Sequence, residues 1–187
     1  MIPPLQEIAS SLRAAWRLFL LDGGAVAGFN RSIEGFWRSF FAAAFALPYY
    51  VLVLWEPYRE GDIGFLRAAA YFVASWVVFP VVAALLTHLL QLGRNYITYI
   101  IALNWAGALV PQPLFLFSLA HRAGLIGEDA FSMVLLGFFI ALLWYGWAIA
   151  RLALGAGVIT ACGFVILSEL LDMLVRALLL WGPQGPA

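Results

Sequence analysis

The sequence contains no lysine, a single cysteine and two histidines, and charged residues make up only 11% of its 187 residues. The lone cysteine, Cys162, excludes an internal disulfide and a cysteine-based metal site. Its apolar surroundings predict a small buried side chain rather than a reactive thiol. The ten basic residues balance the ten acidic ones, so net charge gives no reason to expect a nucleic-acid partner.

The sequence also lacks the short motifs that mark common enzymes. It has no phosphate-binding G-x-x-x-x-G-K-[ST] loop, no G-x-G-x-x-G, no H-E-x-x-H and no G-x-S-x-G. Ser168 stands beside Glu169, but neighbouring residues of a helix point to different faces, which argues against a nucleophile and base pair. We therefore predict a protein that is not an enzyme and has no cofactor and no metal.

Apolar residues are what the chain has in excess. They make up 65% of it, and the mean hydropathy is +0.96. A soluble domain is closer to half apolar and a quarter charged, so this surface needs lipid as its solvent. The composition predicts an all-α, polytopic membrane helical bundle with membrane lipids as its surroundings.

Polar and turn-forming residues divide the chain into about five apolar stretches, each long enough to cross roughly 30 Å of hydrocarbon. Pro48 and Pro80 are expected to kink the first two spans, and Pro111 and Pro113 to distort the third. Residues 1–30 form an interfacial helix and linker, 31–182 the five-span bundle, and 183–187 a flexible tail. The expected spans are 35–55, 65–92, 96–119, 130–150 and 157–181.

An amphipathic helix is predicted ahead of the first span, over residues 5–21. One narrow stripe of this helix is apolar, and a flank beside it is polar. The membrane-surface residues proposed from this pattern are Leu12, Arg13, Trp16 and Arg17. Two placements remain open: the helix lies in the headgroup plane, or it packs on the cytoplasmic end of the bundle. Asn30 or Ser32 is expected to cap the helix that follows.

The most informative polar residues lie in the fifth span, where Glu169, Asp172 and Arg176 share one helical face. A charge at mid-membrane costs about 2.5–3.5 kcal/mol, so this face should contact protein or water. Asp172 and Arg176 are expected to pair at i, i+4. Glu169 is expected to donate a hydrogen bond to Asn104 of the third span, with His88 as the alternative.

Two interpretations of this polar face are open. It could form a proton or ion relay or a polar substrate site, or it could be a buried clamp that fixes helix register. A proton or ion pump would be expected to carry a second cluster of ionisable residues beside this carboxylate pair. The sequence shows none, which favours the clamp.

Two segments carry a family resemblance. One is the connection between the last two spans, and the other lies at the start of the first span. Trp144-Tyr145-Gly146-Trp147 leads to Arg151-Leu152-Ala153-Leu154-Gly155, and Phe29-Asn30-Arg31-Ser32 precedes the first span. The arrangement resembles the Yip family of five-span membrane proteins and uncharacterised alphaproteobacterial proteins. The resemblance implies a membrane-organising role, without the long cytosolic domain that accompanies GTPase contacts in eukaryotic members.

Arginine placement predicts the orientation, because cytoplasmic loops are enriched in basic residues. A cytoplasmic amino terminus in a bacterial inner membrane places the carboxyl terminus in the periplasm. The leading functional hypothesis is a membrane-organising factor or an accessory subunit that contacts lipids, other membrane proteins or its own copies. The alternative is a small transporter or channel component that uses the intramembrane carboxylates. The arginines expected inside are Arg13, Arg17, Arg31, Arg38, Arg94 and Arg151.

Overall fold

The computed structural model describes residues 2–59 and 64–181, and every regular element in these residues is helical. The all-α fold class is therefore confirmed. The expected tail, 183–187, lies outside the described residues. Five helical stretches are long and apolar enough to cross a membrane, which gives the chain the architecture of a multi-pass membrane protein. These stretches are Ile33–Trp55, Phe65–Leu89, Gly93–Arg122, Glu128–Leu152 and Val158–Leu179.

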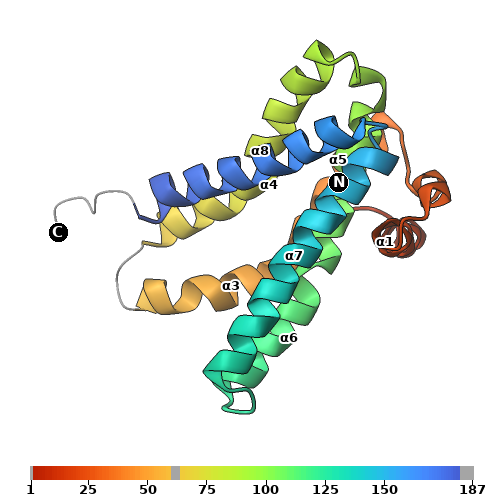
Figure 1. Ribbon diagram of the computed structural model, residues 1–187. Coiled ribbons are helices and arrows are strands. Elements are labelled where there is room, and N and C mark those ends of the chain that lie inside the picture. Colours follow the sequence, from red (N-terminus) through yellow and green to blue (C-terminus); the bar gives the residue numbers. More distant parts are fainter. Residues whose placement is uncertain (1, 60–63, 182–187) are drawn as a thin grey trace.

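The elements follow one another with short connections (Figure 1). In chain order they are α1 (Leu5–Phe19), η1 (Gly23–Gly28), α2 (Ile33–Ser39), η2 (Phe40–Ala42), α3 (Ala43–Arg59), α4 (Phe65–Leu89), η3 (Gly93–Asn95), α5 (Tyr96–Leu109), α6 (Pro111–Arg122), α7 (Glu128–Leu152) and α8 (Val158–Leu179).

Two of the spans are interrupted. The first is α2, η2 and α3 in succession, so its departure from α-helical geometry comes at Phe40–Ala42, before the expected bend at Pro48. The third divides into α5 and α6 at Val110, as its proline pair predicted. Across this division the Gln112 side chain donates to the backbone carbonyls of Ala108 (2.9 Å) and Phe45 (2.7 Å), which joins the broken span to α3.

The second span ends earlier than expected, at Leu89 instead of residue 92. Apolar residues continue to Leu92, but Gln91 adopts a positive φ of 57°, which no α-helix accommodates. Within α4 the helix continues through Pro80, whose carbonyl accepts a hydrogen bond from the Tyr96 hydroxyl (3.0 Å). Figure 1 shows the two halves of α4 running in different directions.

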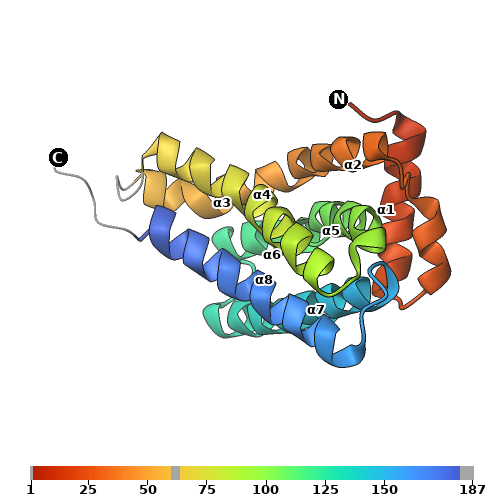
Figure 2. The same cartoon turned by 90° about the horizontal axis from the view of Figure 1, so that it is seen from above.

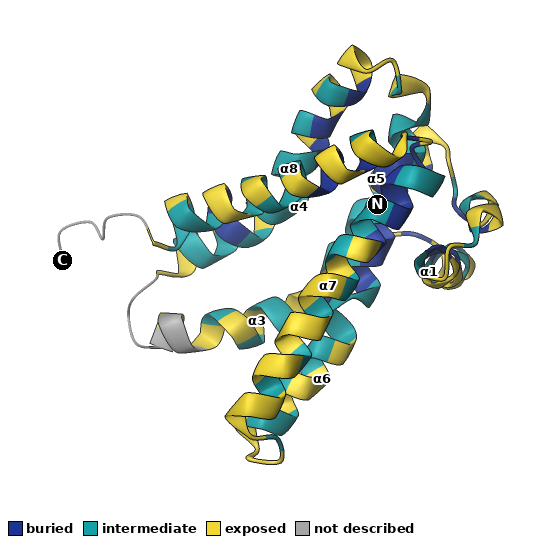
Figure 3. Ribbon diagram, in the orientation of Figure 1, coloured by how far each residue is buried: buried dark blue, intermediate teal, exposed yellow. Residues whose placement is uncertain are grey.

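Helix α5 is the centre of the molecule. It contacts α1, α2, α3, α4, α6 and α7, and Tyr99, Ile100 and Trp105 are almost fully buried there. Figure 3 shows burial concentrated where the helices converge on α5, while the outward faces of the long helices are exposed. In a lipid-embedded chain those exposed apolar faces are the surface that hydrocarbon covers.

The remaining long helices form two arms. Helix α4 lies along α8, and α6 lies along α7 (Figure 1). We call these pairs the α4/α8 arm and the α6/α7 arm. Helices α7 and α8 contact each other at their shared connection, where Gly155 has a φ of 76° and Asn95 donates to the Leu154 carbonyl (2.9 Å). A side chain on Gly155 would be strained at this φ and would crowd Asn95.

Helix α1 lies across one end of the bundle, and the end of α8 lies at the other (Figure 2). The buried face of α1 consists of Ser11, Ala14, Ala15 and Leu18. The Tyr145 hydroxyl donates to the Ala15 carbonyl, and Glu7 pairs with Arg38 (3.0 Å). Helix α1 therefore packs on the bundle, one of the two expected placements, through this face and in part through Ile8, Leu12 and Phe19.

The turn after α1 is held by an ion pair. The Arg17 guanidinium contacts the Asp22 carboxylate, which also accepts a hydrogen bond from the Gly24 amide (2.9 Å). The hydrogen bond from Arg17 lowers the pKa of Asp22 from its ordinary value. Ser32, one of the two expected caps, accepts from the Gly35 amide (3.0 Å) at the start of α2.

Candidate binding site between the helical arms

A cleft of about 480 Å³ lies between the two arms, with residues of α3 and α5 also in its walls. Its size falls within the range of small-molecule sites, roughly 300–1,000 Å³. Most of the lining side chains are apolar, among them Leu114, Phe138, Phe139 and Leu142. The polar lining residues include Tyr49, Tyr50, Tyr71, Ser75, Asn104, Tyr145, Ser168, Glu169, Asp172 and Arg176.

The predicted polar face of the fifth span forms one wall of this cleft. Arg176 and Asp172 pair along α8, with Arg176 Nη2 3.2 Å from Asp172 Oδ2, as expected for an i, i+4 pair. Arg176 Nη2 also donates to the Tyr71 hydroxyl (3.0 Å), which in turn points to Asp172 Oδ1 (3.4 Å). The guanidinium carbon lies 5.6 Å from the centre of the Tyr71 ring, within cation–π range.

These contacts close a triad of Tyr71, Asp172 and Arg176 that ties α4 to α8. Tyr71 is only 4% exposed, whereas the side chains of Asp172 and Arg176 are about two-fifths exposed toward the cleft. Each charge of the triad has an opposite charge and a hydroxyl beside it. The triad therefore neutralises itself and fixes the arm.

Glu169 is different, because it has no such partner. Among the described residues no hydrogen bond or ion pair joins its carboxylate to another side chain, although it lines the cleft and is half-buried near the middle of α8. The expected hydrogen bond to Asn104 is not formed. Asn104 is 4% exposed and donates instead to Ser39 Oγ (2.8 Å), which is fully buried.

The wrong pairing has a simple geometric cause. Asn104 and Glu169 were matched by depth in the membrane, but depth does not say how two helices are rotated. The α5 helix directs Asn104 toward the start of the first span, where Ser39 ends α2. The two residues still share the cleft, since both line it.

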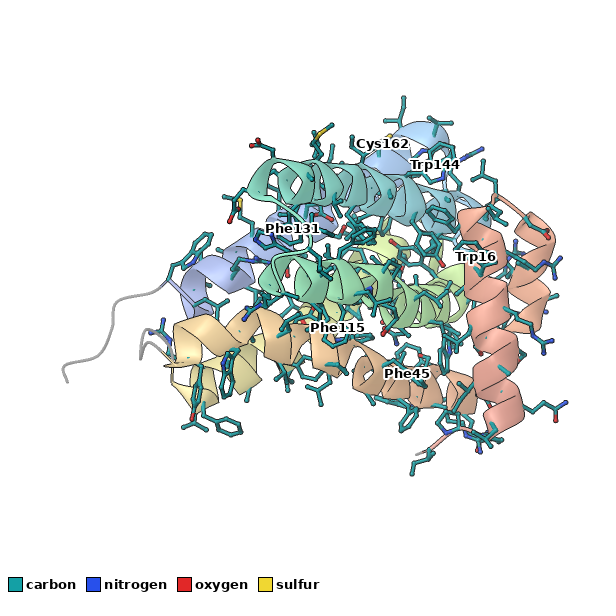
Figure 4. The ribbon with its side chains drawn as sticks, turned by 90° about the horizontal axis from the view of Figure 1, so that it is seen from below. Trp16, Phe45, Phe115, Phe131, Trp144 and Cys162 are labelled. Atoms are coloured by element: carbon teal, nitrogen blue, oxygen red, sulfur yellow. The ribbon has the colours of Figure 1, made fainter. Side chains whose placement is uncertain are left out.

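His88, the expected alternative partner, does not belong to this site. It lies in the last turn of α4 with an exposed side chain and does not line the cleft. Cys162 is also exposed, which contradicts the expected burial, and Figure 4 shows it at the edge of the molecule. The error at Cys162 comes from equating apolar sequence with protein interior, although in a membrane chain apolar sequence also faces lipid.

Three tyrosines that line the cleft, besides Tyr145, are not among the site residues that the sequence predicts. Tyr49 and Tyr50 on α3 have ring centres 6.1 Å apart, and Tyr50 lies 6.0 Å from Tyr71 on α4. All three line the cleft beside the polar face of α8. These tyrosines lie several residues inside the spans, and this position is the sequence signal that distinguishes them from aromatic residues at span ends.

The residues predicted for the surface helix are divided between two environments. Leu12 packs partly against the core, whereas Arg13 and Arg17 are exposed. Trp16 is 57% exposed and stacks on Phe19 with ring centres 5.7 Å apart. Figure 4 shows Trp16 on α1 at the edge of the bundle, away from the cleft.

The described residues contain no group of three or more His, Cys, Asp or Glu side chains placed to hold a metal ion. No family model, no curated protein and no solved structure matches this chain. The resemblance to the Yip family therefore remains a prediction from the sequence, and the candidate site rests on its own geometry.

Proposed function

We propose that this chain is a small transporter or channel component that takes a molecule into the cleft between its arms. The observation that carries the proposal is Glu169, a carboxylate near the middle of a span that lines an open cleft and has no protein partner among the described residues. A structural clamp would pair such a group with another helix, because an unpaired charge in hydrocarbon is costly. Water or a ligand in the cleft supplies the missing partner.

The arrangement of the arms supports the same function. The two arms diverge from a common centre at α5, and the cleft lies between them (Figure 1). The triad holds α4 to α8, so this arm can move as one body against the other. A two-armed bundle around a mid-membrane polar site is the general arrangement by which transporters expose a site alternately to each side.

A role in binding is favoured over catalysis. The Ser168 hydroxyl donates to the Val165 carbonyl of its own helix (2.7 Å) and is not held by Glu169. A nucleophile needs a base within hydrogen-bond reach, and this pair does not provide one. We therefore assign the cleft to non-enzymatic binding and passage.

The membrane-organising or accessory role, with its resemblance to the Yip family, is a second candidate because of α1. Leu5, Trp16 and Leu20 remain 84%, 57% and 60% exposed after α1 has packed on the bundle. An outward apolar stripe beside exposed arginines suits a helix lying at the surface of a membrane. Such a helix would contact lipids, another membrane protein or a second copy of this chain.

The proposed location is the bacterial inner membrane with the amino terminus in the cytoplasm. Arg13, Arg17, Arg94 and Arg151 belong to α1 and to the connections at its end of the bundle. This gathering of basic residues supports a cytoplasmic position for that end. The end of α8 then faces the periplasm.

Thiol labelling tests whether the cleft is open to water in the membrane. In a Cys162→Ser background, Ser168→Cys introduces a thiol into the cleft, and Leu170→Cys introduces one on the exposed side of α8 that does not line it. A charged, membrane-impermeant thiol reagent should modify position 168 and leave position 170, which faces lipid, unmodified. Equal resistance of both positions in proteoliposomes would mean a sealed bundle and would overturn the proposal.

A further inference from the structure

The charged side chains that line the cleft differ in whether they have an ion-pair partner. Arg176 is already engaged by Asp172 and Tyr71, at 3.2 Å and 3.0 Å. Glu169 makes no ion pair or hydrogen bond through its carboxylate among the described residues, and Asp172 lies one helical turn away as a second negative group. In the described lining one cation, Arg176, therefore stands against two carboxylates, so the cleft carries an excess of negative charge.

We infer that the ligand of this cleft is an apolar organic cation, whose charge pairs with Glu169 and whose body lies against the apolar wall. This inference rests on the proposed function, because it names the class of molecule that the cleft takes. The charge is assigned from the unpaired carboxylate. The apolar body is assigned from the walls.

The aromatic lining favours the same class. Tyr49, Tyr50 and Trp76 line the cleft from α3 and α4, and Phe138 and Phe139 line it from α7. Aromatic faces attract cations through the ring quadrupole, more strongly when the cation is desolvated. They also bury the hydrocarbon part of a ligand, so one set of residues serves both ends of such a molecule.

An inorganic cation fits this site poorly. Hard cations such as Ca²⁺ take several oxygen ligands at once, and Mg²⁺ keeps near-octahedral oxygen coordination. In the described residues no group of three acidic, histidine or cysteine side chains surrounds such a position. A diffuse organic charge needs only one carboxylate and an apolar, aromatic surround.

Two probe ions of nearly the same shape and opposite charge test this inference. Tetraphenylphosphonium is the cation and tetraphenylborate the anion, and both are measured against the full chain in lipid nanodiscs by equilibrium binding. We expect saturable binding of the phosphonium and at least tenfold weaker binding of the borate. A tenfold ratio of the two dissociation constants corresponds to about 1.4 kcal/mol of binding free energy. Empty nanodiscs give the contribution of partition into lipid.

Two variants locate the charge. Glu169→Gln keeps the size of the side chain and removes its charge, and should weaken phosphonium binding about tenfold. Glu128→Gln, an exposed carboxylate at the start of α7, is the matched control and should leave binding unchanged. Retained thermal stability of Glu169→Gln shows that the loss is not caused by unfolding.

The outcomes separate this inference from the function on which it rests. Equal binding of the two ions, or phosphonium binding that Glu169→Gln leaves intact, would overturn the organic-cation assignment. If position 168 is still modified by the aqueous thiol reagent, the open cleft stands and only its ligand class is wrong. If position 168 is sealed, the proposed function fails as well.

Discussion

Among the residues that the structure describes, few polar side chains are buried, and two of them bond to each other. Asn104 and Ser39 make a 2.8 Å hydrogen bond between α5 and the end of α2, and Ser39 also donates to the Phe36 carbonyl (2.7 Å). Ser39 is fully buried and Asn104 is 4% exposed, so neither has water as a substitute partner. This bond fixes the first span against the central helix.

Replacing Ser39 should therefore weaken the fold measurably. Ser39→Ala removes the acceptor of the Asn104 amide, and a double-mutant cycle with Asn104→Leu should give a coupling free energy of about 0.6 kcal/mol, with about 1.7 kcal/mol as the upper range in membranes. The free energy of unfolding in mixed micelles measures it. Ser118→Ala is the control, since Ser118 donates only to Leu114 of its own helix (2.8 Å); zero coupling for the first pair would contradict this assignment.

Glycine positions also show what single residues fix. A β-carbon on Gly35 would lie 1.9 Å from the Asn30 carbonyl oxygen, so any larger residue must displace the backbone ahead of α2. Gly107 is approached by the Trp76 ring, 3.0 Å from where its β-carbon would stand. That contact brings α4 against α5 beside the cleft.

At the scale of elements, the spans could be predicted from the sequence because each needs about 20 apolar residues to cross hydrocarbon. The break at Val110 was also predictable, since Pro111 and Pro113 lack backbone donors. The break at Phe40–Ala42 was not, because nothing in those three residues prevents an α-helix. It follows from packing of the first span against α5.

The faces of the helices were harder to predict than their ends. Periodicity identified the polar face of α8, and the Asp172–Arg176 pair follows from helix geometry alone. The predicted bond from Glu169 to Asn104 is wrong, because hydropathy is nearly uniform around a lipid-facing helix and does not specify rotation. For the same reason the sequence did not single out Tyr71.

Helix α1 has three sides, and its placement gives a test of its own. Ser11, Ala14 and Leu18 face the bundle, Trp16 faces outward, and Arg13 lies on a third, exposed side. If α1 lies at the membrane surface, a spin label at Trp16→Cys should collide mainly with oxygen dissolved in lipid. A label at Arg13→Cys should collide mainly with a water-soluble nickel chelate. Both are made in the Cys162→Ser background and read by power saturation in liposomes. Equal exposure of the two labels to the chelate would remove α1 from the surface.

At the scale of the whole molecule, the central claim is that two arms diverge around α5 and leave a cleft between them. The triad joins α4 to α8 in one arm, and α6 lies along α7 in the other. The arms meet each other at the α7–α8 connection and around α5. Such a body is suited to opening and closing about that connection.

The most direct measurement of this claim is the distance between the arms in a membrane. In the Cys162→Ser background, spin labels at Met133→Cys and Met173→Cys, which are 76% and 62% exposed, report on α7 and α8 away from their connection. Trp144→Cys with the native Cys162 gives a reference pair nearer that connection. In nanodiscs, pulsed electron spin resonance should give a clearly longer distance for the first pair, as diverging arms require. A distance as short as that of the reference pair would mean that the arms are packed together and that the cleft does not exist.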